Sequence, residues 1–446
     1  MKIVSTYRVK IKEYRHIFRG TVKLYRDAVS FYISLIHDEW VNFEGQSQKS
    51  AVNLAESLSV RTKHNPQVKT DFGERFYKFP SYLRRGAIAE AYGKVSSYMS
   101  NLKRWEDQDA DMRGEKPSFP KAGYVYPALY KGNMYQGDIF NEYSVNIKVY
   151  RDNTWDWLTV QLKKSDVDYI RNHCKDTEQC VPTLMKRGKQ WFLYFVFKKD
   201  VELTDTPIRE QVVMAVDLGM NSSCTCSVLS ADGTVLGRRF FRLPREYDSL
   251  THKIGHIKRA QKQGSKLTSN LWRYAKGVND DIAVKTANYI IDTAVLYDVD
   301  CIVFEHLDLT GKKSGKKKQK LHLWKARYVQ TMVEHKAHDK SIHISHVNAW
   351  GTSRLAYDGS GMVKRGRESE RCQSHSICEF KTGKIYNCDL NATYNIGARY
   401  FVREIMKTLP VTERQRIEVK IPDSVKRSTC TLSTLISLNG ELRSVG

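Results

Sequence analysis

The stretch Val212-Val213-Met214-Ala215-Val216-Asp217-Leu218-Gly219 decides how the second half of the chain folds. Five apolar residues in a row that end in an acid are typical of a strand buried on both faces. The run Cys301-Ile302-Val303-Phe304-Glu305 repeats the pattern. Because parallel strands bring their carboxyl ends to the same edge of a sheet, Asp217 and Glu305 are expected to be neighbours. A buried carboxylate without a partner is costly, so each needs a reason to be there.

The surrounding sequence predicts an α/β domain from Gln211 onward. Residues 223–230 and 235–241 flank Asp232-Gly233, a strong hairpin signal. A long basic helical region is expected at about 246–276, and a further helix carries the stripe at 282, 286, 290 and 294. A helix at about 324–338, a strand at 342–347 and a closing helix from Leu390 to Ile405 complete the pattern. The last forty residues show no clear periodicity.

The first half reads differently. A strand is expected at 1–10, followed by largely helical sequence from about 14 to 108, with amphipathic stripes at 22–36 and 83–105. Residues 107–121 are charged and rich in Gly and Pro, as connectors are. Three β-type runs, 143–150, 155–162 and 191–197, then predict a small β domain over about 120–205, a barrel completed by the first strand.

Asp389, at the start of the closing helix, supplies a third acid. Three convergent carboxylates repel one another unless cations lie between them. Two Mg²⁺ or Mn²⁺ ions about 4 Å apart would suit such oxygen ligands and could hydrolyse a phosphodiester. Each acid taken alone could instead cap a helix or a turn, and Asp at a helix N-terminus is favoured by the dipole. The topology that joins all three favours the metal site.

The composition points to a nucleic-acid partner. The 446 residues include 73 Lys and Arg against 49 Asp and Glu, a formal net charge of +24, which favours polyanions. A ribosome-associated or merely soluble basic protein could carry the same charge. We expect a cytoplasmic protein, because no apolar stretch of about 20 residues and no signal peptide is evident. Nine scattered cysteines, an odd number, indicate reduced thiols.

Three segments resemble the RuvC motifs of transposon-encoded TnpB proteins, which compact type V CRISPR effectors share. They are Val216–Gly219, Phe304–Leu307 and Asp389–Ile396. Lys325–Tyr328 and Thr352-Ser353 extend the resemblance, which covers about 205–402; the first 200 residues match in layout only. The family's fold implies a multidomain α+β chain with a ribonuclease-H-like nuclease domain and a wedge β-barrel interrupted by a helical recognition domain. The implied divisions are 1–12 and 116–207 (barrel), 13–115 (recognition), 208–402 (nuclease) and 403–446 (a tail without an assigned role).

The resemblance also implies a function. The protein would bind a guide RNA, find a short flanking motif on target DNA, open the duplex and cut it with Asp217, Glu305 and Asp389 holding two Mg²⁺ ions. Base pairing would read the sequence, while a basic channel would hold the heteroduplex. A nucleoid-associated protein is expected, and the sequence leaves open whether it is a monomer or a homodimer. The alternatives are an RNA-guided DNA binder or repressor that cuts little, and an unguided nuclease or transposase-associated protein of the same fold.

The sequence departs from the family at the zinc knuckle, expected within about 351–388. The first Cys-x-x-Cys pair should follow Ser353, but residues 354–359 contain no cysteine. Cys372, His375, Cys378 and Cys388 remain, with spacings that could form a Cys₃His site. The other interpretation, which we prefer, is that Cys378 and Cys388 are small buried residues. Zinc is therefore not expected.

Two basic segments are candidates for contact with nucleic-acid phosphates. A glycine-interrupted run after the second motif contains Lys312, Lys313, Lys316, Lys317 and Lys318. It could equally be a solvated loop. The better candidate is the helical stretch with Lys258, Arg259, Lys262, Lys266 and Arg273, because helical spacing gathers these side chains on one face.

Overall fold

The computed structural model describes residues 1–12, 16–219, 223–265, 267–307, 325–372, 374, 376–425 and 428–444. The chain divides into two compact units, one of residues Lys2–Asp200 and one of Val201–Gly446 together with Met1. The division falls shortly before residue 208, where the nuclease domain is predicted to begin. Within the described ranges, no helix is both long enough and apolar enough to span a membrane.

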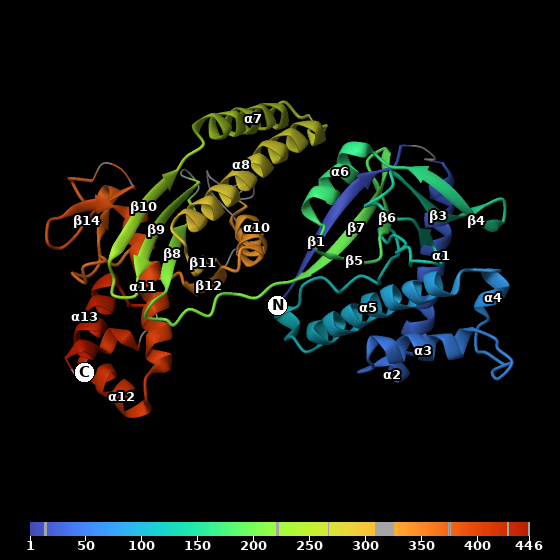
Figure 1. Ribbon diagram of the computed structural model, residues 1–446, viewed down its shortest axis with the longest axis horizontal. Helices are drawn as coiled ribbons and strands as arrows, with labels where there is room; N and C mark the ends of the chain where they lie inside the picture. Colours follow the sequence, from blue (N-terminus) through green and yellow to red (C-terminus); the bar gives the residue numbers. More distant parts are fainter. Residues whose placement is uncertain are drawn as a thin grey trace. The chain divides into compact units, whose positions relative to one another are not determined.

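A five-stranded mixed sheet is the centre of the Val201–Gly446 unit, in the order β10-β9-β8-β11-β12 (Figure 1). β8 is parallel to β11 and β11 to β12, whereas β8 with β9 and β9 with β10 are antiparallel. The predicted hairpin is confirmed, and Gly233 at its tip has a φ of 92°. The strands are β8 Val212–Asp217, β9 Cys224–Ser230, β10 Val235–Phe241, β11 Cys301–His306 and β12 His343–Asn348.

Helices cover both faces of this sheet, as its apolar strands predicted. Alternate strand residues point to opposite faces. Val213, Ala215 and Val303 pack with α11 (Cys388–Thr408), while Met214 and Phe304 pack with helices on the other side. Those helices are α8 (Ser269–Leu296) and α10 (Ala326–Asp339), shown opposite α11 in Figure 1. The result is three layers with an apolar core on each side of the sheet.

α11 approaches the sheet closely at Gly397. A Cβ atom built on Gly397 would lie 2.8 Å from Cδ1 of Leu229 on β9 and 3.5 Å from the Ala215 Cβ. Only glycine lets the helix backbone come this near. Its position in the helix therefore fixes where the first turn of α11 meets the sheet edge.

The predicted helix at 246–276 is wrong in its extent. α7 (Pro244–Lys262) ends there, and α8 begins at Ser269 and includes the stripe assigned to a second helix. Gly264 has a φ of 77° and closes α7 with two hydrogen bonds, from its own N–H to the Gln261 carbonyl (3.1 Å) and from Ser265 N–H to the Ala260 carbonyl (3.0 Å). This is the arrangement by which glycine commonly terminates a helix.

The closing helix is longer than predicted, and the last forty residues are not without structure. α11 continues to Thr408, and two further helices follow, α12 (Val411–Lys420) and α13 (Leu432–Arg443). Ile417 of α12 and Leu435 of α13 are fully buried in the α11 side of the core. This segment therefore belongs to the same unit as the five-stranded sheet.

The Lys2–Asp200 unit contains the predicted first strand and the two predicted long helices. Its helices are α1 Ile17–Asp38, α2 Trp40–Phe43, α3 Gln48–Ser59, α4 Phe72–Arg75, α5 Ser81–Glu106 and α6 Lys164–His173. Its strands are β1 Lys2–Lys10, β2 Tyr135–Gln136, β3 Ser144–Arg151, β4 Thr154–Gln161, β5 Glu178–Gln179, β6 Thr183–Arg187 and β7 Gln190–Asp200. Helices and strands share one apolar core.

The predicted barrel is corrected by the strand pairing. β1 does pair with β7 along its whole length, as expected for a strand that completes a later sheet. The described strands nevertheless form two sheets, β1-β7-β5 with β6 and β2-β3-β4, without a closed barrel. The sheets meet at the isolated bridge between Ile11 and Leu162, which is too short a contact to close a cylinder.

A small three-stranded sheet precedes α11, and it contains part of the cysteine-rich segment. Its strands are β13 Lys364–Arg365, β14 Ile377–Glu379 and β15 Ile385–Asn387. All nine cysteines of the chain are free thiols.

Candidate active site

The register of the parallel strands brings Asp217 and Glu305 together. Val216 of β8 pairs with Phe304 of β11, and each carboxylate is the next residue along its strand. Both lie on the α11 face, because they alternate in step with Ala215 and Val303. The two acids predicted from the apolar runs thus occupy one edge of the sheet.

Asp389 reaches the same place from the first turn of α11. The helix begins at Cys388, and the Asn387 side chain caps it by accepting hydrogen bonds from the Asp389 and Leu390 N–H groups, both at 2.9 Å. Since Asn387 satisfies these backbone groups, the Asp389 carboxylate is not needed as the cap. The helix cap, the simplest structural role for this acid, is therefore provided by Asn387.

Glu305 and Asp389 act electrostatically on Asp217. Burial, followed by repulsion from Glu305 and then from Asp389, raises the pKa of Asp217 well above its usual value. Arg365 opposes part of this rise. Burial also raises the pKa of Glu305. A negative charge close to a carboxyl group raises its pKa, because it disfavours the ionised form.

Glu305 is held by a chain of hydrogen bonds that ends on α11. The Thr352 hydroxyl donates to Glu305 Oε1, and Asn395 Nδ2 donates to the Thr352 carbonyl at 2.9 Å. The Thr352 hydrogen bond and the positive charge of Arg399 lower the pKa of Glu305, against the larger effect of burial. The glutamate is thus oriented as well as buried.

Asn391, Asn395 and Arg399 were not predicted as functional residues. They lie on one face of α11 and bind backbone groups of the segments beside it. Asn391 accepts from Tyr357 N–H (2.8 Å), and Arg399 donates to the carbonyls of residues 348, 350, 428 and 430 at 2.6–3.2 Å. The sequence signal was available: polar residues recur at four-residue spacing within an otherwise apolar helix.

The candidate zinc ligands fall beside this site. The Cys378 thiol donates to the Tyr386 carbonyl (3.5 Å), and its interaction with Cys388 raises the pKa of Cys378 and lowers that of Cys388. Cys372 is buried and adds to the rise at Cys378. His375 lies outside the described residues. Within the described parts of the chain, no cluster of three or more His, Cys, Asp or Glu side chains is arranged to hold a metal ion.

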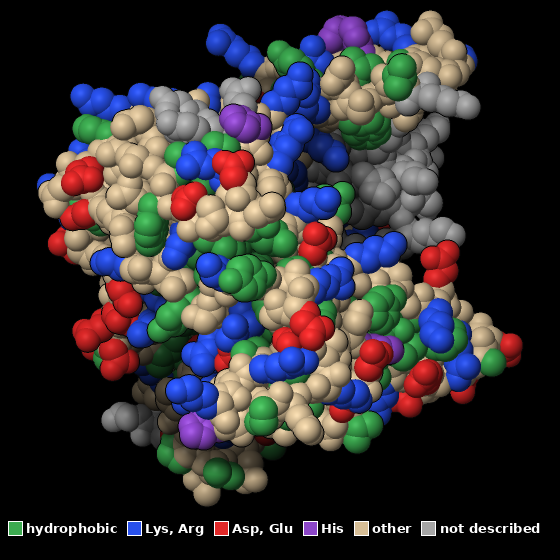
Figure 2. Space-filling view, turned by 90° about the vertical axis from the view of Figure 1, so that its right-hand side faces the viewer, with side chains coloured by type: hydrophobic (Ala, Val, Ile, Leu, Met, Phe, Trp, Pro, Cys, Tyr) green, Lys and Arg blue, Asp and Glu red, His purple; other side chains and the backbone are tan. Residues whose placement is uncertain are grey.

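The predicted nucleic-acid contacts lie on two helices. Lys258, Arg259 and Lys262 are exposed on α7, and Arg273 is exposed on α8. The break at Gly264 separates them, so they do not share a single helix face. Figure 2 shows Lys and Arg side chains over much of one face of the molecule, with Asp and Glu between them. The remaining predicted contacts lie outside the described residues: Lys266, Lys312, Lys313, Lys316, Lys317 and Lys318.

Comparison with known proteins shows that the chain is similar to TnpB-like proteins and Cas12 effectors. A cryo-EM structure of a Cas12f1–sgRNA–target DNA complex contains a chain with a similar fold, with a TM-score of 0.54, 16% identity, and coverage of 85% of this chain and 82% of that one. The TnpB-like protein aq_aa05 of Aquifex aeolicus (strain VF5) is 26% identical over 236 residues, which are 48% of this chain and 74% of that protein. The resemblance to TnpB proteins and type V effectors is confirmed.

A narrower relationship involves the first half of the chain. The sequence profile of the Aq_aa04 family matches residues 5–151. The protein aq_aa04 of the same Aquifex strain is 32% identical over 123 residues, which are 24% of this chain and 68% of that protein. The chain belongs to the Aq_aa04 family.

Proposed function

We propose that the protein is an RNA-guided DNA endonuclease that cuts guide-matched DNA beside a short flanking motif, at a RuvC-type site formed by Asp217, Glu305 and Asp389. The observation that carries the proposal is electrostatic. Three acids from two strands and one helix lie close enough for two of them to raise the pKa of the third. A protein gains nothing in stability from such an arrangement, so a function is the better explanation.

The chemistry of the three acids, rather than a preformed cluster of ligands among the described residues, suits Mg²⁺ or Mn²⁺. Carboxylate oxygens are the ligands these ions prefer, and a cation would relieve the repulsion that opposes ionisation of Asp217. Bound metal would supply an activated water and stabilise the charge that develops on the phosphodiester. The chain itself contributes orientation: Thr352 fixes one oxygen of Glu305, and Asn387 caps the helix whose first turn carries Asp389.

The guide RNA and the target DNA are proposed from the similarity to a Cas12f1 chain and from the positive charge of this chain. The Cas12f1 structure contains sgRNA and target DNA. This chain has a net charge of +24 and exposes Lys258, Arg259 and Lys262 on one helix, which suits contact with phosphates. The Lys2–Asp200 unit would provide the recognition helices and wedge strands, and the five-stranded sheet the nuclease domain.

The test uses the full chain purified with its RNA. Sequencing that RNA identifies the guide, and a DNA substrate that matches it is then incubated with Mg²⁺. We expect cleavage at a position that moves when the guide is changed and that disappears after ribonuclease treatment. Asp217→Ala should abolish cutting and leave DNA binding within a few fold, because metal ligands act mainly on the transition state.

The outcomes separate the three functions. Guide-dependent binding without cutting by the wild type would establish an RNA-guided DNA binder or repressor. Site-specific cutting that survives removal of RNA would establish an unguided nuclease. Full activity of Asp217→Ala would refute the assignment of the site.

A further inference from the structure

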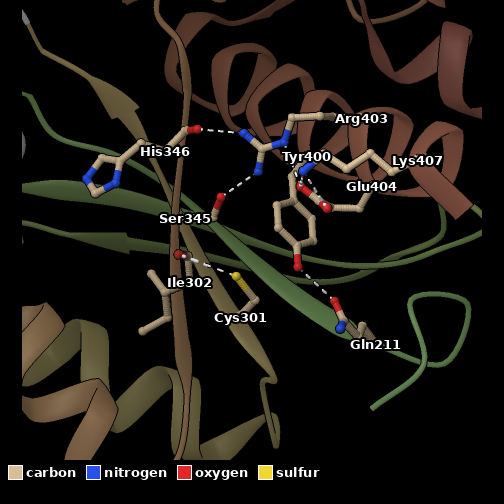
Figure 3. A network of polar contacts seen from close by, with 9 residues as sticks. All are labelled: Gln211, Cys301, Ile302, Ser345, His346, Tyr400, Arg403, Glu404 and Lys407. Carbon is tan, nitrogen blue, oxygen red and sulfur yellow. Dashed lines mark hydrogen bonds and ion pairs between the residues drawn. The ribbon is translucent and has the colours of Figure 1, made fainter. Parts of the chain in front are cut away.

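A cavity of about 120 Å³ lies between α11, α12, the end of β12 and the residues Ser424, Val425 and Cys430. One buried water needs about 10–15 Å³ of such space, so the cavity has room for about ten water-sized groups, and a larger ligand would extend through its open side. None of the three carboxylates lines it. Figure 3 shows two of its lining residues on α11: Arg403, which donates to the His346 carbonyl of β12, and Lys407, which pairs with Glu404.

The cavity is strongly basic. Arg399, Arg403, Lys407 and Arg414 line it, against the single carboxylate of Glu418. Glu404, which is next to the lining, receives hydrogen bonds from Arg403 at 2.7 Å and from Lys407 at 3.0 Å. Counting Glu404 as well, four cations face two carboxylates, which leaves two positive charges. Such an excess beside a partly enclosed space favours an anion.

Two of these cations are fixed by the protein. Arg399 is 3% exposed and donates only to backbone carbonyls. Arg403 donates to the His346 carbonyl (2.9 Å) and to the Ser345 hydroxyl (2.6 Å), in addition to Glu404. Both side chains therefore form part of the cavity wall, and their hydrogen bonds are made to the protein rather than to a ligand.

The other two cations have donors to spare. Lys407 uses two of its three ammonium hydrogens on Glu404. Arg414 donates through Nε to Glu418 at 3.0 Å, and its two Nη groups have no hydrogen-bond partner among the described residues. The side chains of Lys407 and Arg414 are 60% and 53% exposed, so neither is part of the core. Pairing with phosphate oxygens would satisfy these donors.

Most of the remaining wall is apolar, with Asn348 and Ser424 as its polar residues. Val402 and Met406 of α11 are 1% and 6% exposed, and Val347 and Val425 line the cavity with them. A bare inorganic anion would leave this surface unused, whereas a ligand with a sugar or base attached to its phosphate would cover it. The two cations suit the phosphate of a nucleotide, and the apolar wall next to them suits its sugar or base.

We propose that this cavity binds a phosphate-bearing nucleotide, either free or as part of a bound strand. The proposal goes beyond the nuclease function, since the cavity holds none of the candidate catalytic acids and could bind its ligand whether or not the protein cuts DNA. The ligand phosphate would lie against Lys407 and Arg414, and the remainder against the valine and methionine side chains.

Isothermal titration of the RNA-free full chain tests the proposal with four probes: AMP, adenosine, inorganic phosphate and a 5′-phosphorylated dinucleotide. We expect AMP or the dinucleotide to bind at least tenfold more tightly than adenosine and than inorganic phosphate. Binding of both nucleotides points to a free ligand as the source, and binding of the dinucleotide alone to a strand. Equal binding of AMP and inorganic phosphate would refute the nucleotide.

Variants locate the binding. Lys407→Gln and Arg414→Gln should each weaken nucleotide affinity about tenfold without changing the melting temperature, because both side chains are largely exposed. Glu418→Gln should strengthen it a few fold by removing the only lining carboxylate. Lys420→Gln is the matched control: it lies on the same helix, is 50% exposed and pairs with Glu441 outside the cavity. If Lys420→Gln weakens binding as much as Arg414→Gln does, the affinity is general surface charge and the proposed site is wrong.

Discussion

Replacing Asp217 with Asn should stabilise the metal-free protein while it abolishes cleavage. The pKa of Asp217 is raised by burial and then by repulsion from Glu305 and Asp389, with Cys388 adding to the rise and Arg365 opposing it. A carboxyl group whose pKa is raised on folding destabilises the folded state once the pH exceeds its ordinary value. The penalty is absent at low pH and grows as the pH rises toward the folded-state pKa. The advantage of the Asn variant should therefore be larger at pH 8 than at pH 5.

The expected size follows from the sheet geometry. Neighbouring strands lie about 4.8 Å apart. Two unit charges at that separation repel by about 3 kcal/mol at an effective dielectric constant of about 20. The opposing charge of Arg365 and the cost of burying the Asn amide offset part of this, so we expect a net gain of about 1–2 kcal/mol. For a unit of this size the melting temperature should rise by about 2–8 °C.

Differential scanning calorimetry in EDTA at pH 5 and pH 8 measures the effect, and Mg²⁺ is then added. The wild type should gain stability from Mg²⁺, because a ligand that binds only the folded state stabilises it, and Asp217→Asn should gain less. Asp232→Asn is the control of opposite sign. Hydrogen bonds from Ser230 and then from Thr234 lower the pKa of Asp232, so its loss should slightly destabilise the protein at pH 8 and matter less as the pH falls. If Asp217→Asn is less stable than wild type in EDTA at pH 8, the acids do not repel one another as argued.

Three further outcomes are expected. Thr352→Val should lower the cleavage rate about tenfold with little change in DNA binding, because the strand-end glutamate loses its hydrogen bond, and Thr352→Ser should retain activity. Gly397→Val should destabilise the protein by about 1–3 kcal/mol in urea denaturation, since its Cβ would meet a Leu229 methyl, whereas Gly440→Ala on α13 has open space and should be tolerated. Elemental analysis should find well under one zinc per chain, and Cys372→Ser should leave the melting temperature nearly unchanged; stoichiometric zinc that is lost on this substitution would contradict the preferred interpretation.

The sequence predicted the elements whose signal is local. The apolar runs before Asp217 and Glu305 became β8 and β11, and the Asp232-Gly233 hairpin formed where the turn chemistry indicated. The break at Gly264 was missed because basic residues continue on both sides of it, although a glycine at the end of a helix was visible in the sequence. The sequence could not show that the first-half strands form two sheets rather than the predicted barrel, because this depends on pairing between residues such as Ile11 and Leu162 that are far apart in the chain.

The last two helices were missed for a related reason. α12 buries Ile417 and little else, so it has almost no apolar stripe of its own, and its place is set by contact with α11. Local periodicity is weak evidence for helices of this kind, whose stability comes from tertiary packing.

α11 explains why the third motif is more informative than its acid alone. Asn391, Asn395 and Arg399 are buried, and their hydrogen bonds are made to backbone groups on two separate segments. Because a buried polar group is costly when its partner is lost, these contacts fix the rotation and the position of the helix more strictly than apolar packing could. Rotation by one residue, about 100°, would break all of them at once. The same rotation would carry Asp389 away from the strand ends and Lys407 away from the cavity. The polar residues of the motif therefore serve the fold first, and through the fold they place the carboxylate that the proposed chemistry needs.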